Sequence, residues 1–308
     1  MDKQNHCGRV ALIGPPNAGK STLLNALLGQ KITIVTPKPQ TTRNQIVGIL
    51  SEGDDQAIFL DTPGLTEQHG RLSKTMTQAI WSTLREADIL VLVIDGNLYV
   101  RNQDLLETDL GPLIKALSVD ERSMVLVVNK IDLFADKNLM LPLFVKLNEI
   151  WPKAEIFPLS ALAKDGLDEL RKLILKKLPV GEFEFPKDQV STQPVRFMVA
   201  EIIREKLFLY LRQEVPYGVA VDIEAWDEGA EGEQTIIHAL IYVAKAAYKG
   251  MIIGHGGATL KKIGSEARAE IQELLEQKVH LELWVKVRDH WTEDPAFLRD
   301  IGLLTEGG

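Results

Sequence analysis

The residues best suited to chemistry lie near the N-terminus, where Gly14–Ser21 read GPPNAGKS and match the pattern G-x-x-x-x-G-K-[ST]. The motif follows the apolar run Arg9–Ile13 and precedes a helical pattern that opens near Lys20. In such a loop the backbone N–H groups wrap a β-phosphate, the lysine bridges the β- and γ-phosphates, and the serine hydroxyl ligates magnesium. The motif therefore predicts a nucleoside triphosphate site made of Gly14, Pro15, Pro16, Asn17, Ala18, Gly19, Lys20, Ser21 and Thr22.

A second motif, Asp61-Thr62-Pro63-Gly64, ends an apolar run 41 residues beyond Lys20. An acidic residue at this place is typical of a magnesium site, where it holds the ion through water. The N–H of Gly64 would sense the γ-phosphate. DTPG alone is an ordinary turn, but together with the phosphate loop it indicates the second half of a phosphate site.

Thr36–Asn44 (TPKPQTTRN) lies between these two motifs and has the composition of a switch loop. A switch loop needs a threonine hydroxyl that reaches magnesium when the γ-phosphate is present. We predict that Thr42 supplies it, with Thr41 as the alternative. The predicted magnesium ligands are Ser21, Thr42 and Asp61.

Asn129-Lys130-Ile131-Asp132 follows the apolar run Met124–Val128 and predicts recognition of a base. Guanine presents donors at N1 and N2, so the Asp132 carboxylate can accept both protons. Adenine presents an acceptor at N1 and has no N2 amine, so it would leave the carboxylate unpaired. We expect Asn129 to brace the loop and the purine N7, and the Lys130 stem to lie over the ring.

A further short motif, Ser160-Ala161-Leu162, comes 31 residues beyond Asn129 and follows the last apolar run of this region. We expect the N–H of Ala161 to donate to guanine O6. The motif is weak by itself, so this prediction depends on its position after that run.

Short apolar runs alternate with helical patterns through residues 9–178, as in βαβ units that build a mostly parallel sheet with helices on both faces. This pattern predicts an α/β domain over residues 1–178. The predicted strands are Arg9–Ile13, Gln56–Leu60, Ile89–Ile94, Met124–Val128 and Glu155–Pro158, with Ile46–Glu52 as a further edge strand. The predicted helices open near Lys20, Leu72, Gln103, Asn138 and Asp165.

The pattern changes after residue 178. Residues 179–194 contain three prolines and no helical period, which predicts a linker. The order α-β-β-α-α-β then predicts a compact α+β module over residues 195–290, followed by a tail over 291–308. Its parts are a helix over Val195–Arg212, strands over Tyr217–Trp226 and Gln234–Ala244 around an acidic turn (Asp227, Glu228, Glu231, Glu233), a short helix, the loop Gly254–Gly257, a helix over Ala258–Glu276 and a strand over Val279–Arg288.

Composition limits the class of protein. The 308 residues carry a formal charge of −8, and residues 1–180 hold 21 basic and 21 acidic residues, so the acidic excess lies in the C-terminal part. This excess argues against a general nucleic-acid binder. The single cysteine, Cys7, excludes an intramolecular disulfide. No apolar run reaches the ~18 residues of a membrane-spanning helix, and the N-terminus lacks the apolar segment of a signal peptide. We expect a soluble, cytoplasmic protein.

Together the motifs resemble the Era family of bacterial GTPases over nearly the whole chain. The segments GPPNAGKSTLLNALLGQKI, QTTRNQIVGI, DTPGL, NKID and SAL resemble its five GTPase motifs, and RFMVAEIIREKL, MIIGHGGATLKKIG and VHLELWVKV resemble its C-terminal KH domain. The resemblance implies a P-loop GTPase domain followed by a type II KH domain, with GTP, GDP and Mg²⁺ as ligands.

The resemblance also implies a function. GTP hydrolysis would be coupled to binding of the 3′ end of small-subunit (16S) ribosomal RNA, in rRNA processing and assembly of the 30S subunit. It implies a mainly cytoplasmic protein with peripheral association at the inner face of the cell membrane, and we expect a monomer.

Leu65 follows DTPG, where Ras-like proteins use a glutamine to orient the attacking water. Leucine cannot hydrogen-bond that water. Related GTPases with an apolar residue here often use a potassium ion held in part by an asparagine of the phosphate loop, a place that Asn17 occupies. Potassium binding by Asn17 is therefore a hypothesis. We expect slow intrinsic hydrolysis, carried by phosphate positioning and magnesium, with Lys20, Thr42, Gly64 and Asn17 as the catalytic residues.

The KH resemblance implies an RNA site, since a GXXG loop between two helices clamps about four nucleotides. The family usually has a lysine or arginine at a middle position of this loop, where this chain has His255 and Gly256, so we expect one phosphate contact to be weaker or to depend on histidine protonation. We expect Trp284 and Trp291 to cover the core and not to stack on bases. The predicted RNA-binding residues are Ile253, Gly254, His255, Gly256, Gly257, Lys261 and Lys262.

Other functions stay open from the sequence. The chain could be a GTPase of another translation-related step, such as tRNA modification or large-subunit assembly, or its KH domain could serve protein contacts alone. A non-catalytic RNA-binding protein is disfavoured because Lys20, Ser21, Asp61 and Asp132 are all intact.

Overall fold

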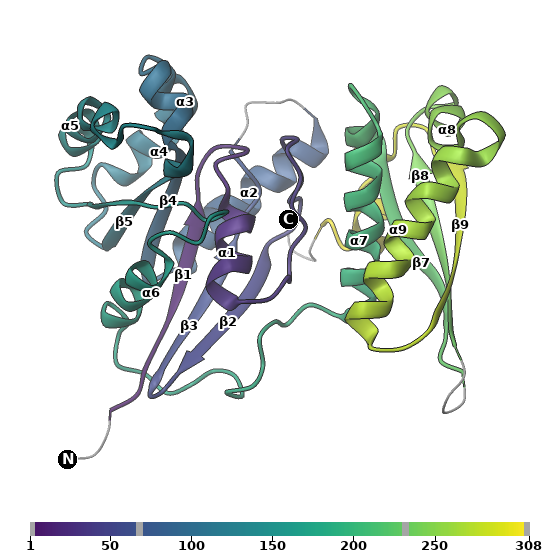
Figure 1. Ribbon diagram of the computed structural model, residues 1–308, viewed down its shortest axis with the longest axis horizontal. Helices are drawn as coiled ribbons and strands as arrows, with labels where there is room; N and C mark the ends of the chain where they lie inside the picture. Colours follow the sequence, from purple (N-terminus) through teal and green to yellow (C-terminus); the bar gives the residue numbers. More distant parts are fainter. Residues whose placement is uncertain (1–3, 66–69, 230–233, 305–308) are drawn as a thin grey trace. The chain divides into compact units, whose positions relative to one another are not determined.

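The chain forms two compact units (Figure 1). The computed structural model describes residues 4–65, 70–229 and 234–304, so Glu231 and Glu233 of the acidic turn and residues 305–308 of the tail lie outside it. The first unit comprises Met1–Thr33, Thr42–Gln68 and Met76–Thr192, and the second comprises Ile34–Thr41, His69–Thr75 and Gln193–Gly308. The sequence did not predict that two short N-terminal segments belong to the second unit.

A six-stranded sheet in the order β2-β3-β1-β4-β5-β6 forms the centre of the first unit. Only β2 is antiparallel, and it pairs with β3. It lies at the edge of the sheet, as predicted. Strand β1 lies between β3 and β4, and the strands that follow it in the sequence are added first on the β3 side and then on the β4 side. The loop after β1 therefore lies where the strand order reverses, which is where ligands bind in such sheets. The strands are β1 (His6–Ile13), β2 (Ile46–Glu52), β3 (Asp55–Asp61), β4 (Ile89–Asp95), β5 (Ser123–Asn129) and β6 (Glu155–Pro158).

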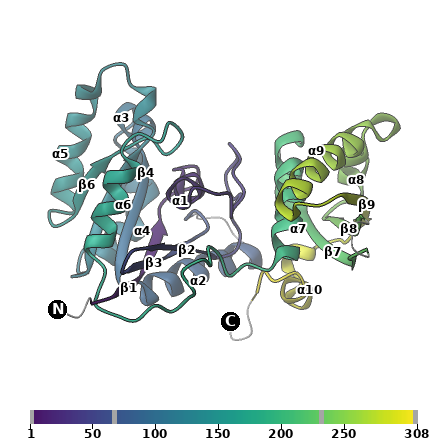
Figure 2. The same cartoon turned by 60° about the horizontal axis from the view of Figure 1, so that its bottom comes forward.

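Helices cover both faces of this sheet (Figures 1 and 2). Helices α1 (Lys20–Leu28) and α6 (Leu167–Lys176) contact each other and β3 on one face. The other face carries α2 (Arg71–Glu86), α3 (Gly96–Arg101), α4 (Leu105–Leu117) and α5 (Leu141–Ile150), whose apolar residues join alternate residues of β1, β4 and β5 in one core. Helix α3 was not predicted, because six residues are too few to show a helical period.

The predicted linker packs along the first unit. Phe183 and Phe185 lie against a cluster that contains Cys7, Ile58 and Leu60. The Gln56 side chain accepts hydrogen bonds from the N–H groups of residues 184 and 185 and donates to the carbonyl of residue 185. One buried side chain thus satisfies the backbone hydrogen-bonding groups of a segment that has no periodicity. The residues in contact, Gln56 and Glu184, lie 128 positions apart in the sequence.

The second unit has the predicted order α-β-β-α-α-β. Its sheet pairs β7 (Val219–Asp227) with β8 (Thr235–Val243) antiparallel, and β8 with β9 (Val279–Val287) parallel. The helices α7 (Val195–Tyr210), α8 (Ala246–Ile253) and α9 (Ala258–Leu275) contribute to one core against this sheet. Short 3₁₀ turns cover Val215–Gly218, His255–Gly257 and Trp291–Glu293 in this unit, and Ile131–Leu133 and Lys137–Met140 in the first unit.

A smaller cluster lies around Trp291 and the short helix α10 (Pro295–Asp300), and it includes Tyr242 of the sheet. Trp291 is completely buried, as predicted. The same prediction is wrong for Trp284, which is 58% exposed. Successive side chains of a strand point to opposite faces, and Leu283 and Val285 already face the core. Within the described part of the chain, no helix has the length and hydropathy needed to span a membrane.

Candidate functional site

The loop between β1 and α1 has a backbone that only small residues can form. Gly14 has φ +142°, and a Cβ there would lie 2.1 Å from the carbonyl oxygen of Val93. Gly19 has φ +96°, and its Cβ would lie 2.2 Å from Nδ2 of Asn129. The loop ends in the first turn of α1, whose N–H groups favour an anion. With this geometry the predicted residues would form a cradle for a phosphate.

Lys20 lies at the centre of the cradle and is 6% exposed. Its ammonium donates to the carbonyl oxygens of Gly14, at 3.1 Å, and Pro15, at 3.0 Å. Burial lowers the pKa of Lys20 to about 8, although the charge of Asp61 opposes the shift. The structure therefore holds a desolvated cation inside the loop, where a triphosphate would supply the negative charge that Lys20 needs.

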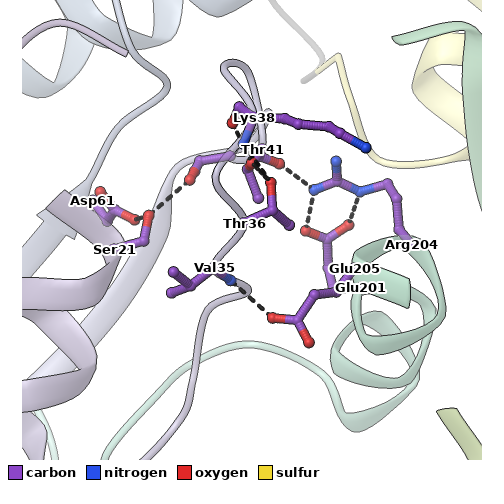
Figure 3. Close-up of polar contacts among 10 residues, drawn as sticks. Ser21, Val35, Thr36, Lys38, Thr41, Asp61, Glu201, Arg204 and Glu205 are labelled. Atoms are coloured by element: carbon purple, nitrogen blue, oxygen red, sulfur yellow. Dashed lines mark hydrogen bonds and ion pairs between the residues drawn. The ribbon is translucent and has the colours of Figure 1, made fainter. Parts of the chain in front are cut away.

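Three oxygen-bearing side chains meet at the start of α1, and Figure 3 shows two of them, Ser21 and Asp61, in contact. Ser21 Oγ donates to Asp61 Oδ2 at 2.7 Å and lies 2.8 Å from Thr42 Oγ1. Asp61 is completely buried, and its Oδ1 has no hydrogen-bond partner among the described residues. Burial raises the pKa of Asp61 to about 6, although the charge of Lys20 and the hydrogen bond from Ser21 oppose the shift.

These oxygens fit a magnesium ion, because a hard cation prefers hydroxyl and carboxylate ligands and would satisfy the unpaired Asp61 oxygen. The structure brings the hydroxyl of Thr42 to this place. The alternative, Thr41, directs its hydroxyl to Thr36 and to the carbonyl of Lys38.

The turn after β3 lies against the phosphate loop. Thr62 Oγ1 donates to the carbonyl of Leu12 at 2.9 Å, and the Leu65 N–H donates to the carbonyl of Gly14 at 3.3 Å. A Cβ on Gly64 would lie 2.7 Å from Cα of Pro16, so this close approach requires glycine. The Leu65 side chain packs toward the core and offers no polar group to a water molecule. Pro63, inside this turn, is buried.

The base-recognition residues gather at the ends of β5 and β6. Asn129 is 3% exposed, and its Nδ2 donates to the carbonyl of Ala18 at 2.9 Å, which braces the loop between β1 and α1. Its Oδ1 accepts the N–H of Ala161 at 3.0 Å. The predicted donor to guanine O6 is therefore bonded to the Asn129 side chain in this structure.

A hydroxyl fixes the predicted guanine carboxylate. Ser160 is completely buried and donates to Asp132 Oδ1 at 2.5 Å, while Asp132 itself is exposed. Lys130 has φ +69° and pairs with Asp95 at 2.6 Å. Sequence reasoning missed Asp95, although an acidic residue that ends the strand beside β5 was a usable signal. Leu162 is 80% exposed at the rim.

A second candidate site lies in the second unit, at the loop Gly254–Gly257 between α8 and α9. A Cβ on Gly254 would lie 2.2 Å from Thr259 Oγ1, and Gly256 and Gly257 have φ of +56° and +79°. His255 is exposed. The loop therefore presents backbone and an imidazole at the start of an 18-residue helix.

A groove of 430 Å³ runs from this loop along α9 to β9. It combines apolar side chains with two cations, the composition of a site for single-stranded nucleic acid. Of the predicted lysines, Lys261 lines the groove, while the Lys262 ammonium lies 4.8 Å from the ring centre of Tyr210 on α7. The lining residues are Gly257, Leu260, Lys261, Gly264, Ser265, Arg268, Leu281 and Leu283. Sequence reasoning missed Arg268, which lies on the face of α9 shared by Lys261 and Ser265, seven and three residues earlier.

Comparison with protein families matches both units. Residues 9–130 match the family described as 50S ribosome-binding GTPase, and residues 214–292 match the KH domain. The chain is 65% identical over 305 residues to GTPase Era of Desulfovibrio desulfuricans, with 99% of each chain covered. It is 59% identical over 307 residues to GTPase Era of Nitratidesulfovibrio vulgaris, with 99% of this chain and 100% of the relative covered.

Two solved structures have the same fold over almost the whole chain, each at 38% identity and a TM-score of 0.89. One is a variant of Aquifex aeolicus Era bound to GDP and AlF4⁻, with 97% of this chain and 100% of that chain covered. The other is Era in complex with MgGDPNP and nucleotides 1506–1542 of 16S ribosomal RNA, with 98% and 100% covered.

Proposed function

The chain belongs to the Era family of GTPases, and on that premise we propose that it binds GTP with magnesium, hydrolyses it, and binds the 3′ end of small-subunit rRNA during 30S subunit assembly. The observation that carries the first part is the convergence of Ser21, Thr42 and Asp61 beside a buried lysine. A completely buried carboxylate with an unpaired oxygen is costly in the absence of a cation.

The proposed roles follow from these positions. Lys20 would bind the β- and γ-phosphates, while Ser21, Thr42 and Asp61 would hold magnesium. Magnesium would neutralise charge on the phosphates. The Gly64 N–H, held close to the phosphate loop, senses the γ-phosphate, and Asp132 selects guanine.

Hydrolysis in this chain lacks a side chain at position 65 that could orient water, so we propose a slow reaction that depends on phosphate positioning. Asn17 is exposed at the loop rim with φ +59°, which supports its proposed role as a potassium ligand. Equal rates of phosphate release in sodium and potassium buffers would contradict that role.

RNA binding is supported by the groove beside the GXXG loop, where Leu260, Leu281 and Leu283 could contact bases while Lys261 and Arg268 meet phosphates. The 16S rRNA fragment carried by a similar solved Era structure supports the identity of the RNA. With GTP bound, the switch residues would be closed and the groove would be available to RNA. Monomeric action and peripheral contact with the membrane are parts of the proposal that rest on the family alone.

Phosphate release from GTP by the full chain, in magnesium buffer, tests the enzymatic part. We expect slow turnover that falls on the order of 100-fold in Lys20→Ala, because a charged contact to the transferred phosphoryl group is lost. The matched control is Lys31→Ala, a change at an exposed lysine shortly after α1. Turnover that is absent from the unmodified protein, or equal in Lys20→Ala, would contradict the proposed activity.

The RNA part is tested with an oligonucleotide of the rRNA 3′-end sequence and a shuffled oligonucleotide of the same composition, at one stated salt concentration. We expect the native sequence to bind at least about tenfold more tightly, as base contacts require. Equal binding of both would contradict sequence-specific recognition and favour a KH domain used for protein contacts.

A further inference from the structure

The switch segment Ile34–Thr41 is held by helix α7 within the second unit (Figure 3). Near its start, the N–H of Val35 donates to Glu205 Oε1 at 2.9 Å. At its end, the carbonyl of Thr41 accepts a hydrogen bond from Arg204 Nη2. Both contacts are made to the main chain, so they fix the path of the segment irrespective of its side chains.

Lys38 adds a third contact. Its ammonium donates to the carbonyl oxygens of Phe208 and Leu211, at the C-terminal end of α7. These carbonyls lie at the negative end of the helix dipole, where a cation is favoured. The segment is therefore held near both ends and in its middle by one helix.

Two of the charged residues of α7, Arg204 and Glu205, are buried to a degree that stability alone does not explain. Arg204 is 3% exposed and Glu205 is 4% exposed. Glu201 balances the charge of Arg204 through contacts of 2.6 and 2.5 Å, yet Arg204 Nη1 is buried with no hydrogen-bond partner in the described part of the chain. A buried ion pair with an unpaired nitrogen contributes little to the stability of the fold, since apolar residues of similar size often stabilise a protein more.

The residue after Thr41 is the predicted magnesium ligand Thr42, whose hydroxyl lies 2.8 Å from Ser21 Oγ. The carbonyl that Arg204 holds belongs to the peptide that joins Thr41 to Thr42. Rotation of this peptide would move the Thr42 backbone and its hydroxyl together. The Arg204 contact therefore constrains the residue that distinguishes a triphosphate from a diphosphate.

We propose that Arg204 is a positioning residue that fixes Thr42 through the Thr41 carbonyl, so that α7 of the KH domain sets how strongly the nucleotide site prefers GTP over GDP. The inference rests on the proposed function. Glu205 assists at Val35, and Lys206 joins Glu205, at 3.0 Å, to Glu270 of α9, at 2.5 Å. Helix α9 lines the RNA groove, so the same contacts connect the switch segment to the helix that would bind RNA.

The test compares full-length Arg204→Met with Arg196→Met, the same change two turns earlier on α7, where the guanidinium carbon lies 5.9 Å from the ring centre of Trp226. Affinities for GDP and for a non-hydrolysable GTP analogue are measured with magnesium. In Arg204→Met we expect the analogue affinity to fall about tenfold and the GDP affinity to change by less than about twofold, because GDP does not engage Thr42. Arg196→Met should match the unmodified chain for both.

If Arg204 had only a structural role, Arg204→Met would lower the melting temperature and weaken the affinities for both nucleotides by the same factor, and that result would overturn the proposal. An unchanged ratio of the analogue affinity to the GDP affinity would also overturn it. If Arg204→Met fails to fold, Arg204→Lys serves instead: it keeps a cation and a donor but loses the paired contacts to Glu201, and it should lose part of the GTP preference. These outcomes are distinct from failure of the proposed function, in which the unmodified chain itself would not hydrolyse GTP.

Discussion

Ser21 and Asp61, 40 residues apart in the sequence, are joined by a 2.7 Å hydrogen bond that leaves the second oxygen of Asp61 buried and unpaired. The phosphate loop supplies the serine, and the end of β3 supplies the carboxylate. The bond aligns two ligand groups beside Lys20. This arrangement of hydroxyl and carboxylate oxygens would suit a cation.

Removal of the Asp61 charge should weaken the magnesium-dependent binding of GTP. We expect Asp61→Asn to lower the magnesium-dependent affinity for a GTP analogue on the order of 100-fold, since a charged contact worth about 3 kcal/mol is lost. Titration calorimetry with and without magnesium measures the effect. Asp55→Asn, at the half-buried start of the same strand, is the control and should bind like the unmodified chain. Retention of full magnesium dependence in Asp61→Asn would contradict the assigned ligand set.

The raised pKa of Asp61, about 6, predicts a pH dependence of stability in the nucleotide- and metal-free protein. In the unfolded chain this carboxyl titrates near 3.8, so the folded state binds the proton more strongly. The buried Asp61 charge therefore lowers the free energy of unfolding fully above pH 6, and this loss disappears as the pH falls toward 4. Asp61→Asn should therefore raise the free energy of unfolding on the order of 2–3 kcal/mol at pH 8 and leave it nearly unchanged near pH 4. Denaturant unfolding at both pH values measures this. A destabilised variant at pH 8 would show that the charge is compensated.

Asp132 should determine the choice of base. In Asp132→Asn the acceptor for two guanine protons becomes half donor, so we expect GTP affinity to fall on the order of 100-fold, while xanthine nucleotides, which carry an oxygen at C2, should gain in relative affinity. Competition binding with GTP, ATP and XTP checks both effects. Asp136→Asn, a change four residues later at a helix cap, should keep guanine preference. An unaltered preference in Asp132→Asn would move base recognition elsewhere.

Trp284 and Trp291 provide a stability comparison. Trp291 is completely buried and donates to the carbonyl of Gly218 at 3.1 Å, so Trp291→Ala should cost about 3–5 kcal/mol of unfolding free energy. Trp284 is 58% exposed, and Trp284→Ala should cost less than about 0.5 kcal/mol. Urea denaturation of both variants gives the values. Similar losses at the two positions would be inconsistent with the observed burial.

The cations of the groove should act through phosphates. Lys261→Gln or Arg268→Gln should weaken binding of the rRNA 3′-end oligonucleotide and lower the slope of log affinity against log salt by about one unit each. Lys172→Gln, at an exposed position on α6 of the first unit, is the control and should leave the slope unchanged. A weakened affinity with the original slope would mean that the contact is not electrostatic.

Much of the fold followed from local patterns. The strands β1, β3, β4 and β5 are continuous apolar runs because both faces are covered, and the phosphate, guanine and GXXG motifs occupy fixed places at element ends. The glycine clashes at Gly14 and Gly19 explain why these motifs are visible in a single sequence. The sequence left Thr41 open as the alternative to Thr42, and the structure places the hydroxyl of Thr42 next to Ser21.

Contacts between distant residues could not be predicted. Glu205 and Arg204 occur on an amphipathic helix, where charges are usually solvated, and nothing local indicates that they bind main-chain atoms 163 to 170 positions away. The Ala161 N–H was predicted to contact guanine, but its bond to Asn129 depends on how β5 and β6 align. The exposure of Trp284 depends on which elements cover each face of a sheet, and alternation alone does not reveal that.

In the proposed switch, the bound nucleotide controls the affinity of the chain for RNA, which is higher with GTP than with GDP. The most direct test of this claim is the affinity of the full chain for the rRNA 3′-end oligonucleotide, measured in magnesium buffer at one stated salt concentration with saturating GDP or a non-hydrolysable GTP analogue. We predict that binding is at least about fivefold tighter with the analogue, the lower end of typical coupling between sites. The same affinity in both nucleotide states would contradict the claim.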